Sequence, residues 1–177
     1  LDDYPHQMSG GMKQRVIGAI AVSALPKIII ADEPTTALDV TIQLQYLRLL
    51  KDIQQETGLA IIFITHDFGI VARMCDRVAV MYAGRIVEQA NVRDLFNQPH
   101  HPYTQALMDS VPKMDRTERL RAIDGQPPPL WDLPEGCRFA SRCVNVKDMC
   151  LTGYPGTTMH ENNHSVSCWM TQPEWNN

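Results

Sequence analysis

The sequence has no long apolar run, no basic block and no charged-then-apolar segment at its start. A membrane helix needs about 20 consecutive apolar residues, so we expect neither a membrane span nor an export signal, and any membrane role would be peripheral, through a partner. The net charge is −4, from 16 basic and 20 acidic residues, which argues against nucleic acid as the main partner. A length of 177 residues is typical of one domain with an appendage.

Cysteine is almost absent from the first three quarters of the chain. Cys75 follows an apolar helical stretch and is expected to be an ordinary core residue. The other cysteines gather late in the sequence: Cys137, Cys143, Cys150 and Cys168. The chain also opens on Leu1 in the middle of a pattern, so we expect it to be the later part of a longer protein.

A short apolar stretch that ends in two acids organises the first part of the chain. Residues 28–31 predict a buried parallel strand, and Asp32 and Glu33 follow at its carboxyl end, the edge where open α/β sheets bind ligands. A buried pair of acids needs a cation, and Mg²⁺ on a nucleotide phosphate is the usual one. A solvated acidic turn would be the simpler interpretation of this stretch taken alone.

The segments on either side of this strand strengthen the nucleotide interpretation. Ser9 is a good N-cap for a helix over 12–25, and Gly10 and Gly11 leave its first backbone N–H groups open to an anion. A helix over 40–56 and a strand over 59–65, expected to be fully buried because its apolar character is continuous, complete a right-handed βαβ unit. The second strand ends at His66, which therefore shares a sheet edge with Asp32 and Glu33.

The remaining elements are shorter. The pattern predicts a short helix over 68–75, a β-hairpin turning at Gly84, and helices over 92–96 and 103–110. His100 and His101 precede Pro102, which suits the first position of a helix, so a loop is expected there rather than a metal site. Proline and glycine leave little room for long elements in the last third, and we place a boundary between about residues 95 and 102.

Together these residues resemble a known family, the ABC-transporter ATPases. Residues 8–15 (Met-Ser-Gly-Gly-Met-Lys-Gln-Arg) resemble the signature motif, 28–33 the Walker B strand, 36–39 (Thr-Ala-Leu-Asp) the D-loop, and His66 the switch histidine. Met8 and Met12 depart from the commoner residues without removing a phosphate-contacting group. The fold class expected from the resemblance is α/β, a partial P-loop NTPase sheet with helices over 1–96.

The resemblance implies a role for each of these residues. Ser9, Gly10 and Gly11 would hold the γ-phosphate of an ATP bound by the opposite subunit, and Asp39 would bridge the dimer interface. Asp32 would hold Mg²⁺, Glu33 would polarise the attacking water, and His66 would contact the γ-phosphate. No G-x-x-x-x-G-K-[ST] loop occurs in the sequence, so we expect that this chain alone cannot turn over ATP.

The tail resembles the C-terminal extension of oligopeptide and dipeptide importer ATPases. The likeness lies in residues 98–104 (Gln-Pro-His-His-Pro-Tyr-Thr), 133–139 (Leu-Pro-Glu-Gly-Cys-Arg-Phe) and 142–143 (Arg-Cys). In that family four cysteines of the tail hold a [4Fe–4S] cluster, which implies that Cys137, Cys143, Cys150 and Cys168 are its ligands. Residues 97–177 would then form a small, irregular, metal-binding C-terminal domain.

The cysteines by themselves leave more than one site open. Disulfides are unfavourable in a cytosolic ATPase, whereas four thiolates suit either Zn²⁺ or an iron–sulfur cluster, although no gap is the usual C-x2-C knuckle. His160 and His164 lie four residues apart near Cys168, so a mixed Cys/His zinc site is a competitor. We expect the metal site to have a structural role rather than a redox role.

The function expected from the resemblance is ATP hydrolysis that energises peptide import, on the cytoplasmic face of the cell membrane. The implied partners are a second ATPase subunit, identical or related, transmembrane permease subunits and, indirectly, a peptide-binding protein. Two other functions compete: a soluble ABC ATPase not tied to transport, and a non-catalytic, metal-holding assembly fragment. The choice among oligopeptide, dipeptide and nickel is not readable in these residues.

Overall fold

The computed structural model describes residues 4–36, 38–111 and 122–176 and divides into two compact units, Leu1–Cys75 (unit 1) and Asp76–Asn177 (unit 2). The division into 1–96 and 97–177, which follows the family motifs, stays a prediction. Among the described residues no helix combines the length and the apolar character that crossing a membrane requires.

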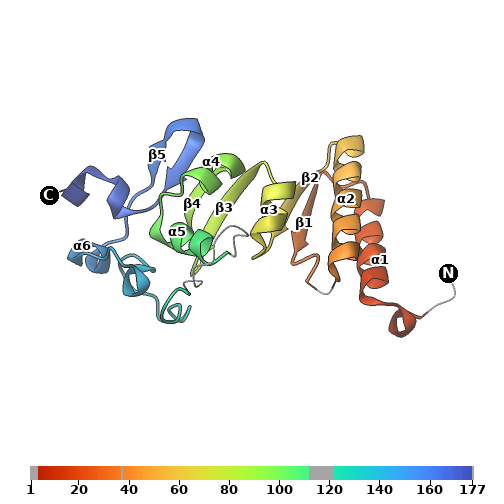
Figure 1. Ribbon diagram of the computed structural model, residues 1–177, viewed down its shortest axis with the longest axis horizontal. Helices are drawn as coiled ribbons and strands as arrows, with labels where there is room; N and C mark the ends of the chain where they lie inside the picture. Colours follow the sequence, from red (N-terminus) through yellow and green to blue (C-terminus); the bar gives the residue numbers. More distant parts are fainter. Residues whose placement is uncertain (1–3, 37, 112–121, 177) are drawn as a thin grey trace. The chain divides into compact units, whose positions relative to one another are not determined.

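Unit 1 follows the predicted order of helices and strands (Figure 1). Its elements are the short 3₁₀ turn η1 (Pro5–Gln7), α1 (Gly10–Ser23), β1 (Ile28–Asp32), α2 (Val40–Thr57), β2 (Ala60–Ile64) and α3 (Phe68–Met74). Ser9 caps α1 as predicted, since its Oγ accepts from the N–H of Met12, and Asp39 caps α2, since its Oδ1 accepts from the N–H of Ile42. Gly58 ends α2 in the left-handed region at φ +70°.

The two strands of unit 1 pair in parallel, which confirms the predicted βαβ unit. Ile28 lies opposite Ala60, and Asp32 lies opposite Ile64 at the carboxyl ends. α1 and α2 lie side by side (Figure 1), where Arg15 Nη2 donates to Gln45 Oε1 at 2.8 Å. Gly18 permits this approach, because a Cβ there would lie 2.9 Å from the Tyr46 hydroxyl.

The prediction that both strands of unit 1 are fully buried is wrong. Alternate side chains are open to solvent, with Ile28 at 58%, Ile30 at 66%, Ile62 at 52% and Ile64 at 49% exposure. These side chains share one face of the two-strand sheet, and no element among the described residues covers that face. The acid pair is not buried either, since Asp32 is exposed and Glu33 only half-buried.

Unit 2 is built around an antiparallel sheet with strand order β3-β4-β6-β5. Its helices and strands are β3 (Arg77–Tyr82), β4 (Arg85–Asn91), α4 (Val92–Asn97), α5 (Pro102–Asp109), α6 (Asp148–Thr152), β5 (Thr158–His160) and β6 (His164–Val166). Its described residues also form the 3₁₀ turns η2 (Ala140–Arg142), η3 (Glu161–Asn163), η4 (Trp169–Thr171) and η5 (Pro173–Asn176). The predicted hairpin is confirmed, with Ala83 and Gly84 both at positive φ in its turn.

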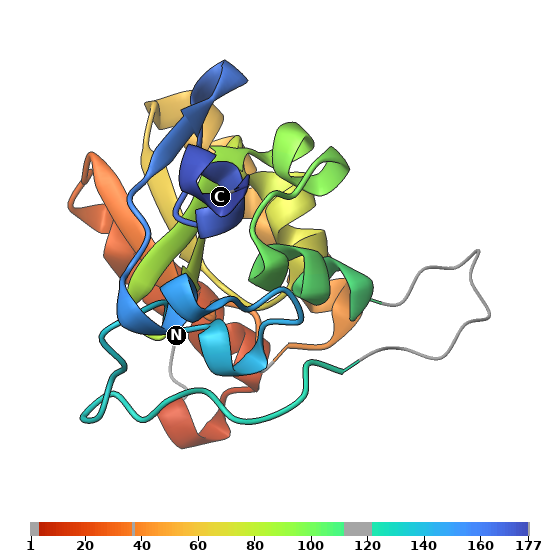
Figure 2. The ribbon, with the colours of Figure 1, turned by 90° about the vertical axis from the view of Figure 1, so that its left-hand side faces the viewer.

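The strands β5 and β6 were not predicted. Three-residue strands carry too little alternation to be recognised in a sequence rich in proline, glycine and asparagine. They form a hairpin that extends the sheet (Figure 2), and β6 pairs with β4 through Glu88 opposite Val166 and Gln89 opposite Ser165. The tail is therefore part of the sheet of unit 2.

The core of unit 2 joins the β3–β4 hairpin to the cysteine-rich tail. The buried residues in contact are Val80, Tyr82, Val87, Ala90, Leu95 and Phe139. The ring of Phe139 meets that of Tyr82 edge-on at 5.2 Å between centroids. Arg142 adds polar links, because its guanidinium donates to the carbonyl oxygens of Ile123 and Asp124 and to the Tyr82 hydroxyl.

Candidate functional site

The structure brings Glu33 and His66 into direct contact at the carboxyl edge of the two-strand sheet. His66 Nδ1 lies 2.7 Å from Glu33 Oε1, so that Nδ1–H donates to the carboxylate and Nε2 is left to face a ligand. Both side chains are open to solvent, at 38% for Glu33 and 82% for His66. A ligand arriving at this edge of unit 1 could therefore reach both groups.

The second oxygen of the Glu33 carboxylate is also held. Thr36 Oγ1 donates to Glu33 Oε2 at 2.7 Å. The hydrogen bonds from Thr36 and then His66 lower the pKa of Glu33 below its usual value. The group is thus held as a carboxylate, the form that can accept a proton.

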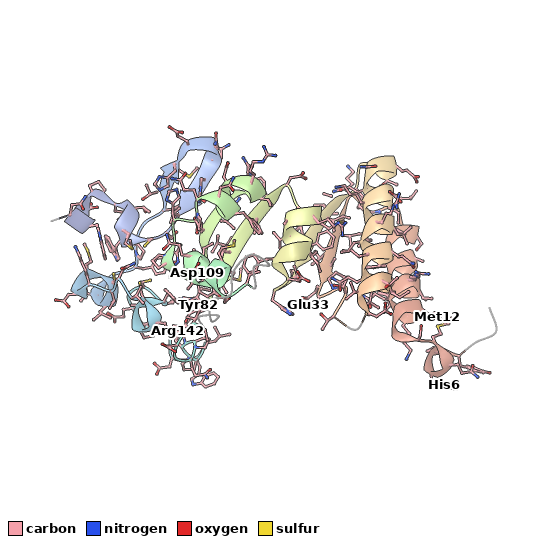
Figure 3. The ribbon with its side chains drawn as sticks, viewed as in Figure 1. His6, Met12, Glu33, Tyr82, Asp109 and Arg142 are labelled. Atoms are coloured by element: carbon pink, nitrogen blue, oxygen red, sulfur yellow. The ribbon has the colours of Figure 1, made fainter. Side chains whose placement is uncertain are left out.

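The residues resembling the signature motif lie at one end of the α1–α2 pair. Ser9 caps α1, Gly10 and Gly11 form its first turn, and a Cβ on Gly11 would lie 2.9 Å from Ile42 of α2. Asp39 caps α2 at the same end, and Met12 and Glu33 also lie toward that end of unit 1 (Figure 3). Ala37, within the stretch that resembles the D-loop, lies outside the described residues.

The four late cysteines meet at one pocket in unit 2. Cys137, Cys143, Cys150 and Cys168 all line it, together with His101 and the apolar side chains of Phe139, Trp169, Met170 and Trp175. All four are free thiols. Burial raises the pKa of Cys137 and Cys143 and raises that of Cys168 to about 12, with neighbouring thiols adding to the rise. Without a cation the thiols of Cys137, Cys143 and Cys168 are therefore neutral.

The described residues do not show the predicted metal-binding C-terminal domain. In the ranges 4–36, 38–111 and 122–176, no three His, Cys, Asp or Glu side chains are placed to hold a metal ion. His160 and His164 do not line the cysteine pocket. Each instead stacks or tilts against His100, at 4.5 Å and 4.6 Å between ring centroids.

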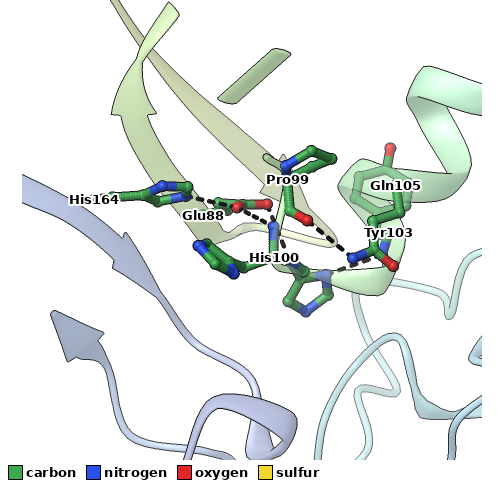
Figure 4. A network of polar contacts seen from close by, with 7 residues as sticks. Glu88, Pro99, His100, Tyr103, Gln105 and His164 are labelled. Atoms are coloured by element: carbon green, nitrogen blue, oxygen red, sulfur yellow. Dashed lines mark hydrogen bonds and ion pairs between the residues drawn. The ribbon is translucent and has the colours of Figure 1, made fainter. Parts of the chain in front are cut away.

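A buried carboxylate, Glu88, connects three separate segments of unit 2 (Figure 4). Its side chain is fully buried. It accepts the backbone N–H of His100 at 2.7 Å and of His101 at 3.1 Å, and His164 Nε2 donates to Oε1 at 2.7 Å. Each buried acceptor therefore has a donor, which is what makes a desolvated carboxylate tolerable.

His101 begins α5 as its N-cap, as the position of Pro102 predicted. It is 1% exposed, and its Nδ1 accepts the N–H of Tyr103 at 3.0 Å. Burial lowers the pKa of His101 to about 4, partly offset by Glu88, so the ring is neutral at pH 7.

Sequence reasoning missed Thr36 and Glu88. Thr36 lies in the stretch that resembles the D-loop. A hydroxyl three residues after a functional acid, Glu33, is the sequence signal that could have identified it. Glu88 lies in the middle of β4, a glutamate in a strand is ordinarily solvated, and no sequence pattern connects it to residues 100, 101 and 164. Its importance depends on contacts between distant segments.

Two family models match the chain. The model described as "ABC transporter" matches residues 1–36, and the model described as "Oligopeptide/dipeptide transporter, C-terminal region" matches residues 87–150. The first match includes Ser9, Asp32 and Glu33, and the second includes Glu88 and three of the four pocket cysteines.

Curated relatives resemble nearly the whole chain. The dipeptide transport ATP-binding protein DppD of Bacillus subtilis is 53% identical over 96% of this chain and 51% of its own length. The oligopeptide transport ATP-binding proteins AppD of Bacillus subtilis and OppD of Haemophilus influenzae are 50% and 47% identical, each over 98% of this chain and 53% and 54% of their own lengths. The chain therefore spans about half the length of the curated relatives it matches.

Replacing Glu88 with glutamine should destabilise unit 2. An amide has one acceptor oxygen, so at least one of the three donors loses its partner, which costs about 1–3 kcal/mol. Urea unfolding followed by tryptophan fluorescence measures this, because all three tryptophans, Trp131, Trp169 and Trp175, lie in unit 2. The exposed control Glu135→Gln should stay within about 0.5 kcal/mol of wild type. Equal midpoints for Glu88→Gln and wild type would show that the network contributes nothing.

The stability of unit 2 should fall as the pH drops from 6.5 to 4. Between these pH values His101 becomes protonated in the unfolded chain, whereas in the folded chain it accepts the proton only near its pKa of about 4. The free energy of unfolding should therefore fall by about 3 kcal/mol by pH 4. His101→Asn keeps a capping acceptor but cannot titrate, so its unfolding free energy should lose less over this range. Parallel pH profiles of the two proteins would contradict this assignment.

Proposed function

The chain belongs to the ABC-transporter ATP-binding proteins of the oligopeptide/dipeptide transporter group, and from this premise we propose that it forms the catalytic-acid part of an ATPase that energises peptide import. The observation that carries the proposal is the Glu33–His66 contact of 2.7 Å at the carboxyl edge of the sheet. Phosphoryl transfer to water needs a positioned base and groups that face the phosphate, and this pair supplies both.

In the proposed reaction Glu33 orients the attacking water and accepts its proton. The water oxygen bonds to the γ-phosphorus, and the bond from that phosphorus to the bridging oxygen breaks, so that ADP leaves with the electron pair. With a hydrogen on each ring nitrogen, His66 would donate Nε2–H to the γ-phosphate while Nδ1–H stays on Glu33. Asp32, exposed at the end of β1, would hold Mg²⁺, which neutralises phosphate charge when bound.

The proposed site is completed by groups outside this sequence. Residues 1–177 contain no G-x-x-x-x-G-K-[ST] loop, so the cradle for the phosphates must come from elsewhere. Ser9 caps α1, and Gly10 and Gly11 form its first turn, where the backbone N–H groups of a helix have no intrahelical partners. This end of α1 suits the γ-phosphate of an ATP held by a second subunit, with Asp39 at the interface. A second ATPase subunit, identical or related, is therefore part of the proposal.

We further propose that this assembly works on the cytoplasmic face of the membrane. The relatives are named as dipeptide and oligopeptide transport ATP-binding proteins, which supports a peptide as the cargo. The partners would be transmembrane permease subunits, with a peptide-binding protein delivering cargo to them.

Glu33→Gln should lower Mg-ATP hydrolysis by the assembled transporter at least about 100-fold, because the amide cannot accept the proton of the water. Glu56→Gln, which changes an exposed carboxylate at the end of α2, should leave the rate unchanged. The 177-residue chain alone should show no turnover. Hydrolysis by the isolated chain that depends on Glu33 would mean that the phosphate cradle lies within these residues. Equal rates for the wild-type and Glu33→Gln transporters would show that Glu33 has no part in the mechanism.

For unit 2 we propose that the four pocket cysteines hold a [4Fe–4S] cluster with a structural role. The donor set fits, since four thiols from separate segments line one pocket shielded by apolar side chains. A single Zn²⁺ would gather the four thiolates around one point at about 2.3 Å. In a cluster each thiolate binds a different iron atom, so wider spacing is suitable. When bound, the cluster would cross-link the tail.

Anaerobic reconstitution of the chain with iron and sulfide tests this proposal. Wild type should gain four iron and four sulfide per chain, with the broad visible absorbance of an iron–sulfur cluster. Cys143→Ser should lose most of it, whereas Cys75→Ser, in unit 1, should bind as wild type does. Tight binding of one Zn²⁺ without uptake of iron and sulfide would replace the cluster with a zinc site.

A further inference from the structure

The turn that follows β1 folds back on itself. Glu33 has a positive φ of 44°, unusual for a residue with a side chain, and its N–H donates to the carbonyl oxygen of Ile64 at 2.9 Å. Thr36 N–H approaches the carbonyl oxygen of Glu33 at 3.4 Å. The backbone therefore reverses within four residues and returns the side chain of Thr36 to that of Glu33.

The returned hydroxyl completes a clamp on the carboxylate. Thr36 Oγ1 holds Oε2 and His66 Nδ1 holds Oε1, each at 2.7 Å. Hydrogen bonds to an ionised acceptor are about twice as strong as neutral ones, and two of them on different oxygens fix the plane of the group. One bond alone would leave the carboxylate free to rotate about its last torsion.

The clamp is anchored to the rest of unit 1. Thr35, beside Thr36, is buried at 7% exposure, and the N–H of Leu38 donates to the carbonyl oxygen of Thr35 at 3.0 Å. Asp39 then caps α2. The side chain of Thr36 itself is exposed, so its hydroxyl is not needed to fill the core.

We infer that Thr36 is a positioning residue for Glu33 in the ATPase proposed above. Its hydroxyl keeps the carboxylate in the orientation that faces the attacking water, while His66 fixes the opposite oxygen. The inference rests on the proposed function, because positioning matters only if Glu33 acts on water. A misaligned base loses rate without losing nucleotide, so Thr36 should govern kcat and leave the KM for Mg-ATP alone.

The test compares hydroxyl and methyl at this position in the assembled transporter. Thr36→Val, nearly the same shape, should lower kcat about tenfold or more with an unchanged KM, and Thr36→Ser should restore most of the rate. Thr41→Val removes a hydroxyl from another exposed threonine of unit 1 and should behave as wild type. Circular dichroism checks folding, and Thr36→Ala serves if the valine variant does not fold.

The outcomes separate this inference from the proposed function. If Glu33→Gln abolishes hydrolysis while Thr36→Val keeps the wild-type kcat, the positioning role is wrong and the ATPase proposal stands. Equal losses in Thr36→Val and Thr36→Ser would also overturn the role, because the hydroxyl would not be the cause. If Glu33→Gln hydrolyses ATP at the wild-type rate, the proposed function itself fails.

Discussion

The parallel register of β1 and β2 is the constraint on which the chemistry of unit 1 depends. Asp32 pairs with Ile64, so the residues just beyond each strand, Glu33 and His66, emerge at the same edge. The turn after β1 adds Thr36 to the same place, and the result is a carboxylate held through both oxygens.

Unit 2 depends on a different interaction, a carboxylate removed from water. Glu88 lies on β4, and its partners come from the start of α5 and from β6, so one side chain ties three segments together. Removing a charge from water is expensive, and only the full set of donors offsets that cost. The same network brings His101 to the cysteine pocket, where the tail, short of long helices, folds around thiols and aromatic rings.

Most of the regular structure could be predicted. Strong periodicity, helix caps and a glycine turn located every helix and strand from α1 to α5, with ends within a few residues. The exposure of β1 and β2 could not be predicted. An apolar run indicates that a strand can be buried, but it does not show whether neighbouring elements cover the strand. The strands β5 and β6 were not predicted because their own patterns are too short, and because β6 pairs with β4, which is distant in the sequence, as Glu88 opposite Val166 shows.

The sequence by itself determined the βαβ unit, the residues at its carboxyl edge and the four cysteines that form one group. These features depend on residue type and on short-range spacing, which the sequence contains. Only the tertiary structure decided that Thr36 returns to Glu33, that Glu88 is a buried junction and that His160 and His164 lie with His100 instead of with the cysteines. These contacts arise from backbone reversal and from pairing between distant segments. Their energies depend on burial, which no single stretch of sequence contains.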